Sequence, residues 1–228
     1  MSRVEVDGVG IEYDVFGAGR PVVLLHGFPD TGRLWRHQAP MLAEAGFQVI
    51  VPDLRGYGRS DKPEAVDAYS IRVLAGDVMA ILAAQGIGRA HVVGHDWGAA
   101  LAWAMASFAP GHVDHLVVLS VGHPAGFMRT FQQRQKSWYM LLFQFPGVAE
   151  TWLSADNWAN FRNWAGHPDT DQVIAELEPA VPSRRPSTTT GPTFRPRAGS
   201  RRPCDSRRSS RPPWASGARE TSPSPRRR

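Results

Sequence analysis

Residues 94–98 are the feature that most constrains the fold: a Gly-His-Asp-Trp-Gly turn between an apolar run and an Ala-rich stretch. His91-Val92-Val93 precedes the turn and residues 99–106 follow it, which predicts a strand, a tight turn and a helix. Small residues on both sides of Asp96 fit such a turn, because its strained backbone runs close to neighbouring backbone. The sequence therefore predicts an acidic side chain at the apex of a strand–turn–helix unit.

An acid at this apex has a specific chemical consequence. Turns of this kind usually read Gly-x-Ser-x-Gly, and the serine forms an acyl ester by attacking a carbonyl carbon. A carboxylate in the same place displaces a leaving group from saturated carbon and forms an alkyl ester. Asp96 therefore indicates epoxides or alkyl halides as substrates. The structural alternative is that Asp96 only caps the following helix.

The loop His26-Gly27-Phe28-Pro29 follows the apolar run 21–25, which predicts a buried strand. A loop in this position can bring the backbone N–H of Phe28 to the carboxyl of Asp96, opposite the N–H of Trp97. Two further strands are predicted over residues 47–52 and 116–121, and apolar spacing predicts a helix over 71–85.

Taken in this order, the motifs at 26–29, 53–60 and 94–99 resemble those of the α/β-hydrolase fold, and within it those of the epoxide hydrolases. The stretch 139–150 resembles the start of the helical cap of that family. The resemblance implies an α/β fold, a mostly parallel sheet with flanking helices. It divides the chain into an N-terminal core over 1–124, a partial cap over 125–180 and a tail over 181–228, with the C-terminal strands missing.

The resemblance also implies a mechanism. Asp96 is the nucleophile, Tyr139 is a cap tyrosine that hydrogen-bonds the epoxide oxygen, and the amides of Phe28 and Trp97 form the oxyanion hole. The partners are a small apolar epoxide and water; no cofactor, metal, membrane or nucleic acid is expected, and the oligomeric state stays open. The remaining motif residues are His26, Gly27, Pro29, Gly94, His95 and Gly98.

Several catalytic parts of the family have no counterpart in this chain. The second cap tyrosine, the late histidine and its orienting acid belong to segments that the resemblance does not find here. All eight histidines precede residue 183. His123 follows the strand 116–121 and could approach the site, but no motif makes it a base, and the other histidines outside the motifs are expected on the surface or in the core. The chain as written is therefore expected to be inactive or crippled.

The tail changes composition abruptly. Residues 183–228 contain 13 Arg, no Lys and 2 acids, a charge of +11, whereas the first 182 residues carry 13 basic and 19 acidic residues, a charge of −6. Such a segment cannot bury enough surface to fold, so we expect disorder. Residues 186–194 can be written with one choice of synonymous codons, and reading that DNA one nucleotide earlier encodes Leu-Asn-Tyr-Tyr-Arg-Ala-Asn-Phe. This peptide resembles a later cap helix of the family. A frameshift near residues 178–180 is the favoured hypothesis, and a nucleic-acid-binding tail is the alternative.

Composition excludes other classes. No run of eighteen apolar residues suggests a membrane span, and the N-terminus has no apolar signal region. A single cysteine, Cys204, fits a cytoplasmic protein without internal disulfides. The main alternative within the fold is a haloalkane or fluoroacetate dehalogenase, which needs N–H donors for halide; Tyr139 favours the epoxide hydrolase. A non-enzymatic protein with a basic tail is the third possibility.

Overall fold

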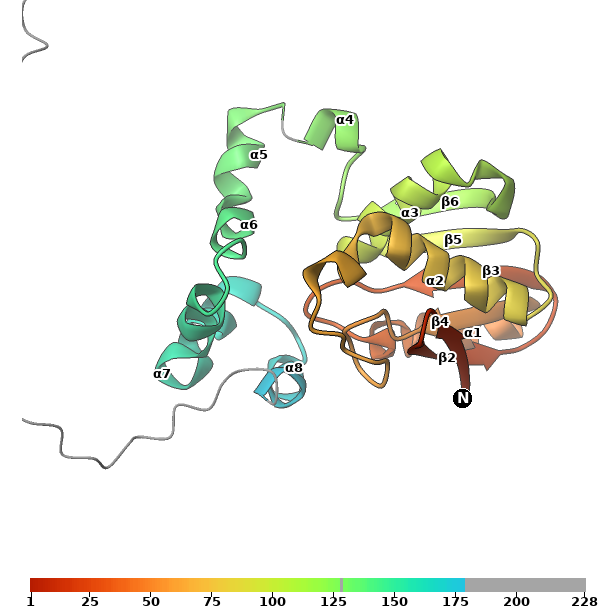
Figure 1. Ribbon diagram of the computed structural model, residues 1–228, viewed down its shortest axis with the longest axis horizontal. Helices are drawn as coiled ribbons and strands as arrows, with labels where there is room; N and C mark the ends of the chain where they lie inside the picture. The colour runs from red at the N-terminus through yellow and green to blue at the C-terminus, as the bar shows by residue number, and fades with distance from the viewer. Residues whose placement is uncertain (128, 179–228) are drawn as a thin grey trace, which may run out of the picture. The chain divides into compact units, whose positions relative to one another are not determined.

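One six-stranded sheet, in the order β1-β2-β4-β3-β5-β6, organises the computed structural model, which describes residues 1–127 and 129–178 (Figure 1). β2 is antiparallel to both β1 and β4, and the pairs β3–β4, β3–β5 and β5–β6 are parallel. The strands are β1 (Ser2–Val6), β2 (Val9–Phe16), β3 (Arg20–Leu25), β4 (Phe47–Pro52), β5 (Ala90–His95) and β6 (Val113–Leu119).

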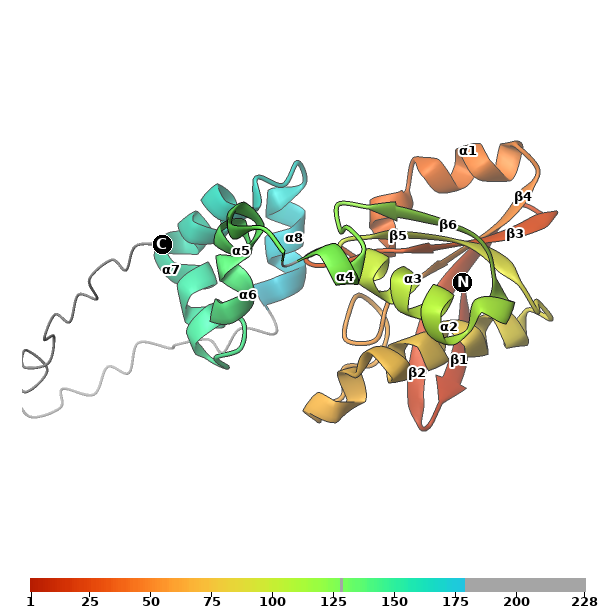
Figure 2. The same ribbon diagram turned by 90° about the horizontal axis from the view of Figure 1, so that it is seen from above.

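Helices cover both faces of the sheet. Figure 2 shows α1 (Gln38–Glu44) on one face, and α2 (Ile71–Ala84) and α3 (Trp97–Phe108) on the other. One hydrophobic cluster joins α2 and α3 to β3 and β5, and a second joins α1 to β3 and β4. Short 3-10 turns lie at η1 (Gly32–Trp35), η2 (Val66–Tyr69) and η3 (Pro110–His112). This is the α/β architecture that the sequence predicts.

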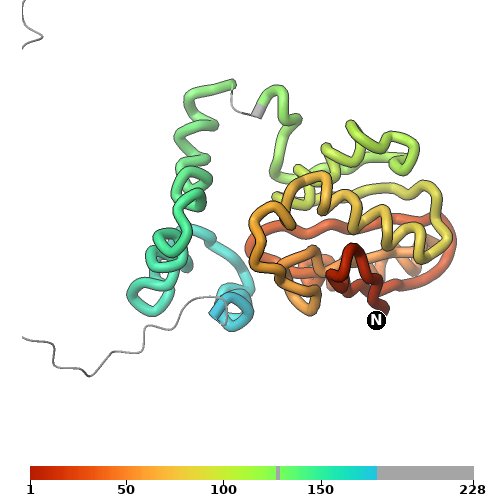
Figure 3. Tube along the Cα trace, viewed as in Figure 1, coloured from red at the N-terminus to blue at the C-terminus, as the bar shows by residue number. Residues whose placement is uncertain are grey.

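All six described strands precede a helical segment in the chain, and the colours of Figure 3 follow this order. This segment has its own hydrophobic cluster around Leu153, Phe161 and Ile174, and Phe28 of the core packs against it. The backbone of α7 is non-helical over residues 155–158. The helices are α4 (Pro124–Phe127), α5 (Phe131–Lys136), α6 (Trp138–Leu142), α7 (Val148–Ala165) and α8 (Thr170–Leu177).

Most predicted elements are confirmed, and one has wrong bounds. The strand expected over 116–121 is β6, which begins at Val113 and ends at Leu119. The polar residues Asp114 and His115 interrupt the apolar run, so the sequence did not indicate where the strand begins. The strand ends before Ser120, because the φ of 70° at Ser120 lies outside the extended region. The predicted tail over 181–228 lies outside the described residues. Within the described residues, no helix is long and apolar enough to span a membrane.

The turn after β4 is fixed by a buried ion pair. Nε and Nη2 of Arg55 donate to the two carboxylate oxygens of Asp77 on α2, at 2.9 and 2.6 Å. Both side chains are at least 95% buried. The pair ties the strand-end turn to α2.

Replacing Asp77 should therefore destabilise the protein strongly. We expect Asp77→Ala to lower the free energy of unfolding by about 3–5 kcal/mol, because it leaves the Arg55 charge buried and unpaired. Urea denaturation followed by circular dichroism measures this. The matched control is Asp67→Ala, which removes an exposed acid from η2 and should change stability by less than about 0.5 kcal/mol. Equal effects of the two substitutions would show that the ion pair does not hold the turn.

Candidate functional site

Asp96 lies at the apex of a strained turn between β5 and α3. Its φ of 52° and ψ of −119° are unusual for a residue with a side chain. The flanking glycines permit the turn: a Cβ at Gly94 would come within 2.2 Å of the Gly98 carbonyl oxygen, and one at Gly98 within 2.2 Å of the Leu25 carbonyl oxygen. The side chain of Asp96 makes no capping hydrogen bond to α3. The helix-cap alternative is therefore wrong, and the carboxyl is available for other contacts.

The loop after β3 supplies one of the two amide donors that the sequence predicts. The N–H of Phe28 donates to Oδ1 of Asp96 at 3.0 Å. Gly27 allows this approach, because a Cβ there would lie 2.5 Å from both Cβ and Oδ1 of Asp96. The same Cβ would lie 2.6 Å from the amide nitrogen of Trp97, so that nitrogen also adjoins the loop. The peptide bond between Phe28 and Pro29 is cis.

His26 holds this loop in place as an uncharged ring. The N–H of Leu54 donates to its Nε2 at 2.9 Å, so Nδ1 carries the proton and donates to the Gly27 carbonyl at 3.1 Å. The side chain is fully buried, and burial lowers the pKa of His26 to about 4. His26 therefore connects the ends of β3 and β4 and remains neutral near pH 7.

Tyr139 lies in α6 of the helical segment, within reach of the charge of Asp96. Burial, with a smaller contribution from the negative charge of Asp96, raises the pKa of Tyr139, so its hydroxyl keeps a proton to donate. Its ring packs against Phe143 and Trp164 at centroid distances of 5.7 and 5.1 Å. Phe28 contacts the same two rings, at 5.5 and 6.3 Å. These four aromatic rings, Phe28, Tyr139, Phe143 and Trp164, form an apolar wall that joins the residue of the amide donor to Tyr139.

The sequence analysis did not predict a place in the site for Tyr57, Asp30 or His167. Burial raises the pKa of Tyr57, and the charge of Asp96 adds to this effect. Nε2 of His167 lies 3.0 Å from Oδ1 of Asp30, and both side chains are largely buried. The N–H of Asp169 donates to Nδ1 of His167, so Nε2 carries the proton that Asp30 accepts. His167 was expected only as a surface or core residue, and its separation of 137 positions from Asp30 left no local signal of the pair.

The other histidines named in the sequence have different surroundings. His95 lies in β5 and its Nδ1 is buried without a hydrogen-bond partner among the described residues. His123 is exposed, its ring packs edge-on against Trp103 at 4.8 Å, and its Nδ1 accepts the N–H of Ala125. Neither contact gives His123 the role of a base.

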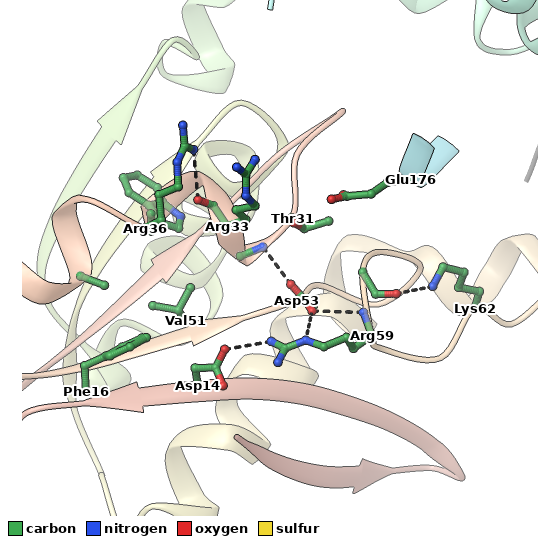
Figure 4. Close-up of a pocket in the computed structure, with 14 residues that line it drawn as sticks. Asp14, Phe16, Thr31, Arg33, Arg36, Val51, Asp53, Arg59, Lys62 and Glu176 are labelled. Carbon is green, nitrogen blue, oxygen red and sulfur yellow. Dashed lines mark hydrogen bonds and ion pairs between the residues drawn. The ribbon is translucent and has the colours of Figure 1, made fainter. Parts of the chain in front are cut away.

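A cavity of about 630 Å³ lies elsewhere, beside η1 and β2, and does not include Asp96 among its lining residues (Figure 4). Asp53 lies at its centre and accepts hydrogen bonds from the backbone of Gly32 and from Arg59, which also pairs with Asp14. Burial acts to raise the pKa of Asp53, but these hydrogen bonds hold it below its usual value. The charges of Asp53, Arg59 and Asp14 are paired with one another, so we place the candidate site at Asp96.

This chain is similar to several known proteins. A family profile described as the alpha/beta hydrolase fold matches residues 20–170. "Epoxide hydrolase A" of Mycobacterium tuberculosis is 40% identical over 182 residues, which cover 75% of this chain and 56% of that protein. "Epoxide hydrolase 2" of Siraitia grosvenorii is 39% identical over 155 residues, 65% of this chain and 49% of that protein.

Solved structures give the same picture. The crystal structure of epoxide hydrolase A from Mycobacterium thermoresistibile matches with a TM-score of 0.63 and 37% identity, over 77% of this chain and 58% of that one. An epoxide hydrolase from Vigna radiata matches with a TM-score of 0.60 and 36% identity, over 68% and 50%. The chain thus spans about half the length of the relatives that it matches.

The burial of His26 predicts a pH dependence of stability. Its pKa is about 4 in the folded protein and its ordinary value is 6.5. Between these values the unfolded chain binds a proton that the folded chain does not, so stability is complete above pH 6.5 and falls as the pH drops toward 4. We expect His26 to account for about 3 kcal/mol of this loss.

Urea denaturation of the wild type and of His26→Gln between pH 4 and 7 measures this contribution. The wild type should lose more stability than the variant over this interval. His37→Gln, a change at an exposed histidine, should keep the wild-type slope. An unchanged slope in His26→Gln would contradict the prediction.

Proposed function

We propose, since this chain belongs to the alpha/beta hydrolase fold family, that its chemistry is that of an epoxide hydrolase, which converts an epoxide into a vicinal diol. The observation that carries the proposal is the position of the Asp96 carboxyl. It lies on a strained turn, accepts the N–H of Phe28, and is close enough to Tyr139 for its charge to raise the pKa of that hydroxyl. Nucleophile, amide donor and acid thus meet beside one aromatic wall.

In the proposed first step, the two carboxylate oxygens of Asp96 have different roles. Phe28 holds Oδ1, so Oδ2 of Asp96 attacks an epoxide carbon from the side opposite the C–O bond. The new C–O bond forms an alkyl ester as the epoxide C–O bond breaks. Tyr139 hydrogen-bonds the departing oxygen and gives it the proton that makes it a hydroxyl, and the tyrosinate then takes a proton back from water. The apolar wall around Tyr139 suits a small apolar epoxide.

In the second step, water attacks the carbonyl carbon of the ester. Negative charge develops on the former Oδ1, where the amides of Phe28 and Trp97 stabilise it, and collapse releases the diol and regenerates Asp96. This step needs a base to take the proton of water. In the family that the sequence resembles, the base, its orienting acid and the second tyrosine come from segments without a counterpart among the described residues. We therefore propose that this chain forms the ester and hydrolyses it very slowly.

A dehalogenase is the second candidate, because Asp96 could displace halide by the same attack. Trp97 directly follows Asp96 and about half of its surface is exposed, so its indole N–H is one potential halide donor. The protonated Tyr139 hydroxyl favours the epoxide, since a departing alkoxide accepts a hydrogen bond more strongly than a halide. Comparing a terminal epoxide with the matching alkyl bromide separates the two functions.

The proposed role of Asp96 as nucleophile can be tested by covalent labelling. Incubation of the full chain with styrene oxide should produce one covalent adduct, seen by intact-protein mass spectrometry, and peptide mapping should place it on Asp96. Asp96→Asn should give no adduct, because the amide is a poor nucleophile at the same position. The control Asp67→Asn removes an exposed carboxylate and should label like the wild type. Labelling retained in Asp96→Asn would remove Asp96 from this role.

The proposed persistence of the ester depends on the lack of a general base for its hydrolysis among the described residues. General-base assistance typically contributes roughly 10²–10⁴-fold, so the adduct should accumulate to one per chain without steady-state formation of diol. Multiple turnovers by mass-verified full chain would show that another residue acts as the base. The proposal for Asp96 would survive that result, but the proposal of an inactive second step would not.

The proposed role of Tyr139 as the acid can be tested by the rate of labelling. Tyr139→Phe should slow adduct formation by about 10²-fold and leave the final yield unchanged, because the ring still packs but no proton donor remains. The control is Tyr69→Phe, since the Tyr69 hydroxyl only donates to the Pro63 carbonyl at 2.7 Å. Equal labelling rates in the two variants would exclude Tyr139 as the acid.

A further inference from the structure

Three metal-binding side chains meet at the opposite end of β5 from Asp96. Nδ1 of His91 lies 3.1 Å from Nδ1 of His115 and 3.3 Å from Oδ2 of Asp114. The third side of this triangle, from His115 Nδ1 to Asp114 Oδ2, is 3.4 Å. Among the described residues, this is the group of three histidine or acidic side chains whose ligand atoms come together closely enough to share an ion.

An irregularity in strand pairing creates the cluster. Ala90 pairs with Val113, but Val92 pairs with Leu116, so β6 has one extra residue at this point. His91 therefore faces two residues, Asp114 and His115, instead of one. Consecutive residues of a regular strand point to opposite faces, whereas a bulge can bring both side chains to one partner. Spacing in the sequence did not predict a metal site here, because the bulge is not visible in the sequence.

With Asp114 ionised, protons alone cannot make all three contacts of this triangle favourable. If both Nδ1 atoms carry protons, each can donate to Asp114, but then two N–H groups face each other across 3.1 Å. If only one ring carries its proton on Nδ1, the lone pair of the other ring faces the carboxylate oxygen. Either arrangement leaves one of the three close pairs repulsive. A cation at the centre makes all three contacts favourable, because each atom presents a lone pair to it.

The dimensions of the triangle match one kind of ion. Tetrahedral zinc has ligand distances of about 2.0–2.1 Å to nitrogen and oxygen, which separates neighbouring ligand atoms by about 3.3 Å. The three measured separations are 3.1, 3.3 and 3.4 Å. Two imidazoles and one carboxylate are also a ligand set that zinc accepts, whereas magnesium and calcium prefer oxygen. We propose that His91, Asp114 and His115 bind Zn²⁺ or a similar divalent transition metal.

The surroundings of the triangle leave one coordination position of a bound ion open to water. The His115 side chain is 75% exposed, so water can occupy the fourth tetrahedral position. The other carboxylate oxygen of Asp114 lies 3.9 Å from Nε of Arg89, whose guanidinium also donates to the Val113 carbonyl. The ring of Phe47 packs edge-on against His91 at 6.0 Å and supports it from β4.

The site is separate from the proposed hydrolytic centre. His91 and Asp96 are five residues apart along one extended strand, which places their backbones about 16 Å from each other. The ion would instead join β6 to β5. Among the described strands, β6 is an edge strand held by β5 alone, so this link would fasten its beginning.

Zinc binding is tested on the untagged full chain carrying Cys204→Ser, which removes the single thiol. Calorimetric titration with ZnCl₂ should show one site per chain, and ZnCl₂ should raise the midpoint of thermal unfolding. Co²⁺ should give the intense visible absorption of a tetrahedral site. His115→Ala and Asp114→Asn, both changes at exposed residues, should each weaken binding by at least about 10-fold.

The matched control is His37→Ala, which removes an exposed histidine at the start of α1 and should leave zinc affinity unchanged. The proposal is overturned if the wild type shows neither heat of binding nor a shift of the unfolding midpoint. It is also overturned if His115→Ala and Asp114→Asn bind like the wild type, because zinc would then be held elsewhere. Asp96→Asn should bind zinc normally, so the outcome does not depend on the hydrolase proposal.

Discussion

The close approach of backbone to backbone around the Asp96 turn is the constraint on which the site depends. Gly94 and Gly98 have no room for a Cβ, and Gly98 lies directly against the end of β3. This packing forces β3, β5 and α3 to meet at one point and holds Asp96 at a positive φ. Because the turn is held from several sides, the carboxyl is presented beside the Phe28 amide instead of relaxing onto its own helix.

Around this turn the protein favours uncharged partners for the carboxylate. His26 is neutral because two backbone groups fix its tautomer and burial lowers its pKa to about 4. Tyr57 and Tyr139 keep their protons because burial and the Asp96 charge raise their pKa values. The Asp96 charge therefore adjoins the Phe28 amide and two protonated tyrosines, as well as Asp30, whose pKa it helps to raise. Such an environment suits a nucleophile that must lose its charge when it forms a neutral ester.

Local sequence predicted the parts of the site that one turn or one strand creates. The turn at Asp96 and the helix predicted over 71–85, which is observed over 71–84, follow from neighbouring residues, because glycine placement and apolar spacing are local signals. The Phe28 donor lies 68 positions from Asp96, and it was predicted from the place of its loop in the order of motifs. Contacts that depend on distant pairing were not predictable in this way. The Asp30–His167 pair joins the loop after β3 to the segment before α8, and the extra residue in β6 depends on its register with β5.

The two ends of β5 show how differently one strand can be constrained. At its carboxyl end, glycines and backbone contacts hold Asp96 in strain. At its amino end, His91 faces a bulge whose polar residues are partly exposed. Charged residues at the start of an edge strand discourage pairing with other chains. The second half of β6 lacks this protection, because Val117 and Leu119 are 49% and 43% exposed. An ion that fixes Asp114 and His115 would therefore stabilise the protected half of the strand and leave the apolar half as its weakest part.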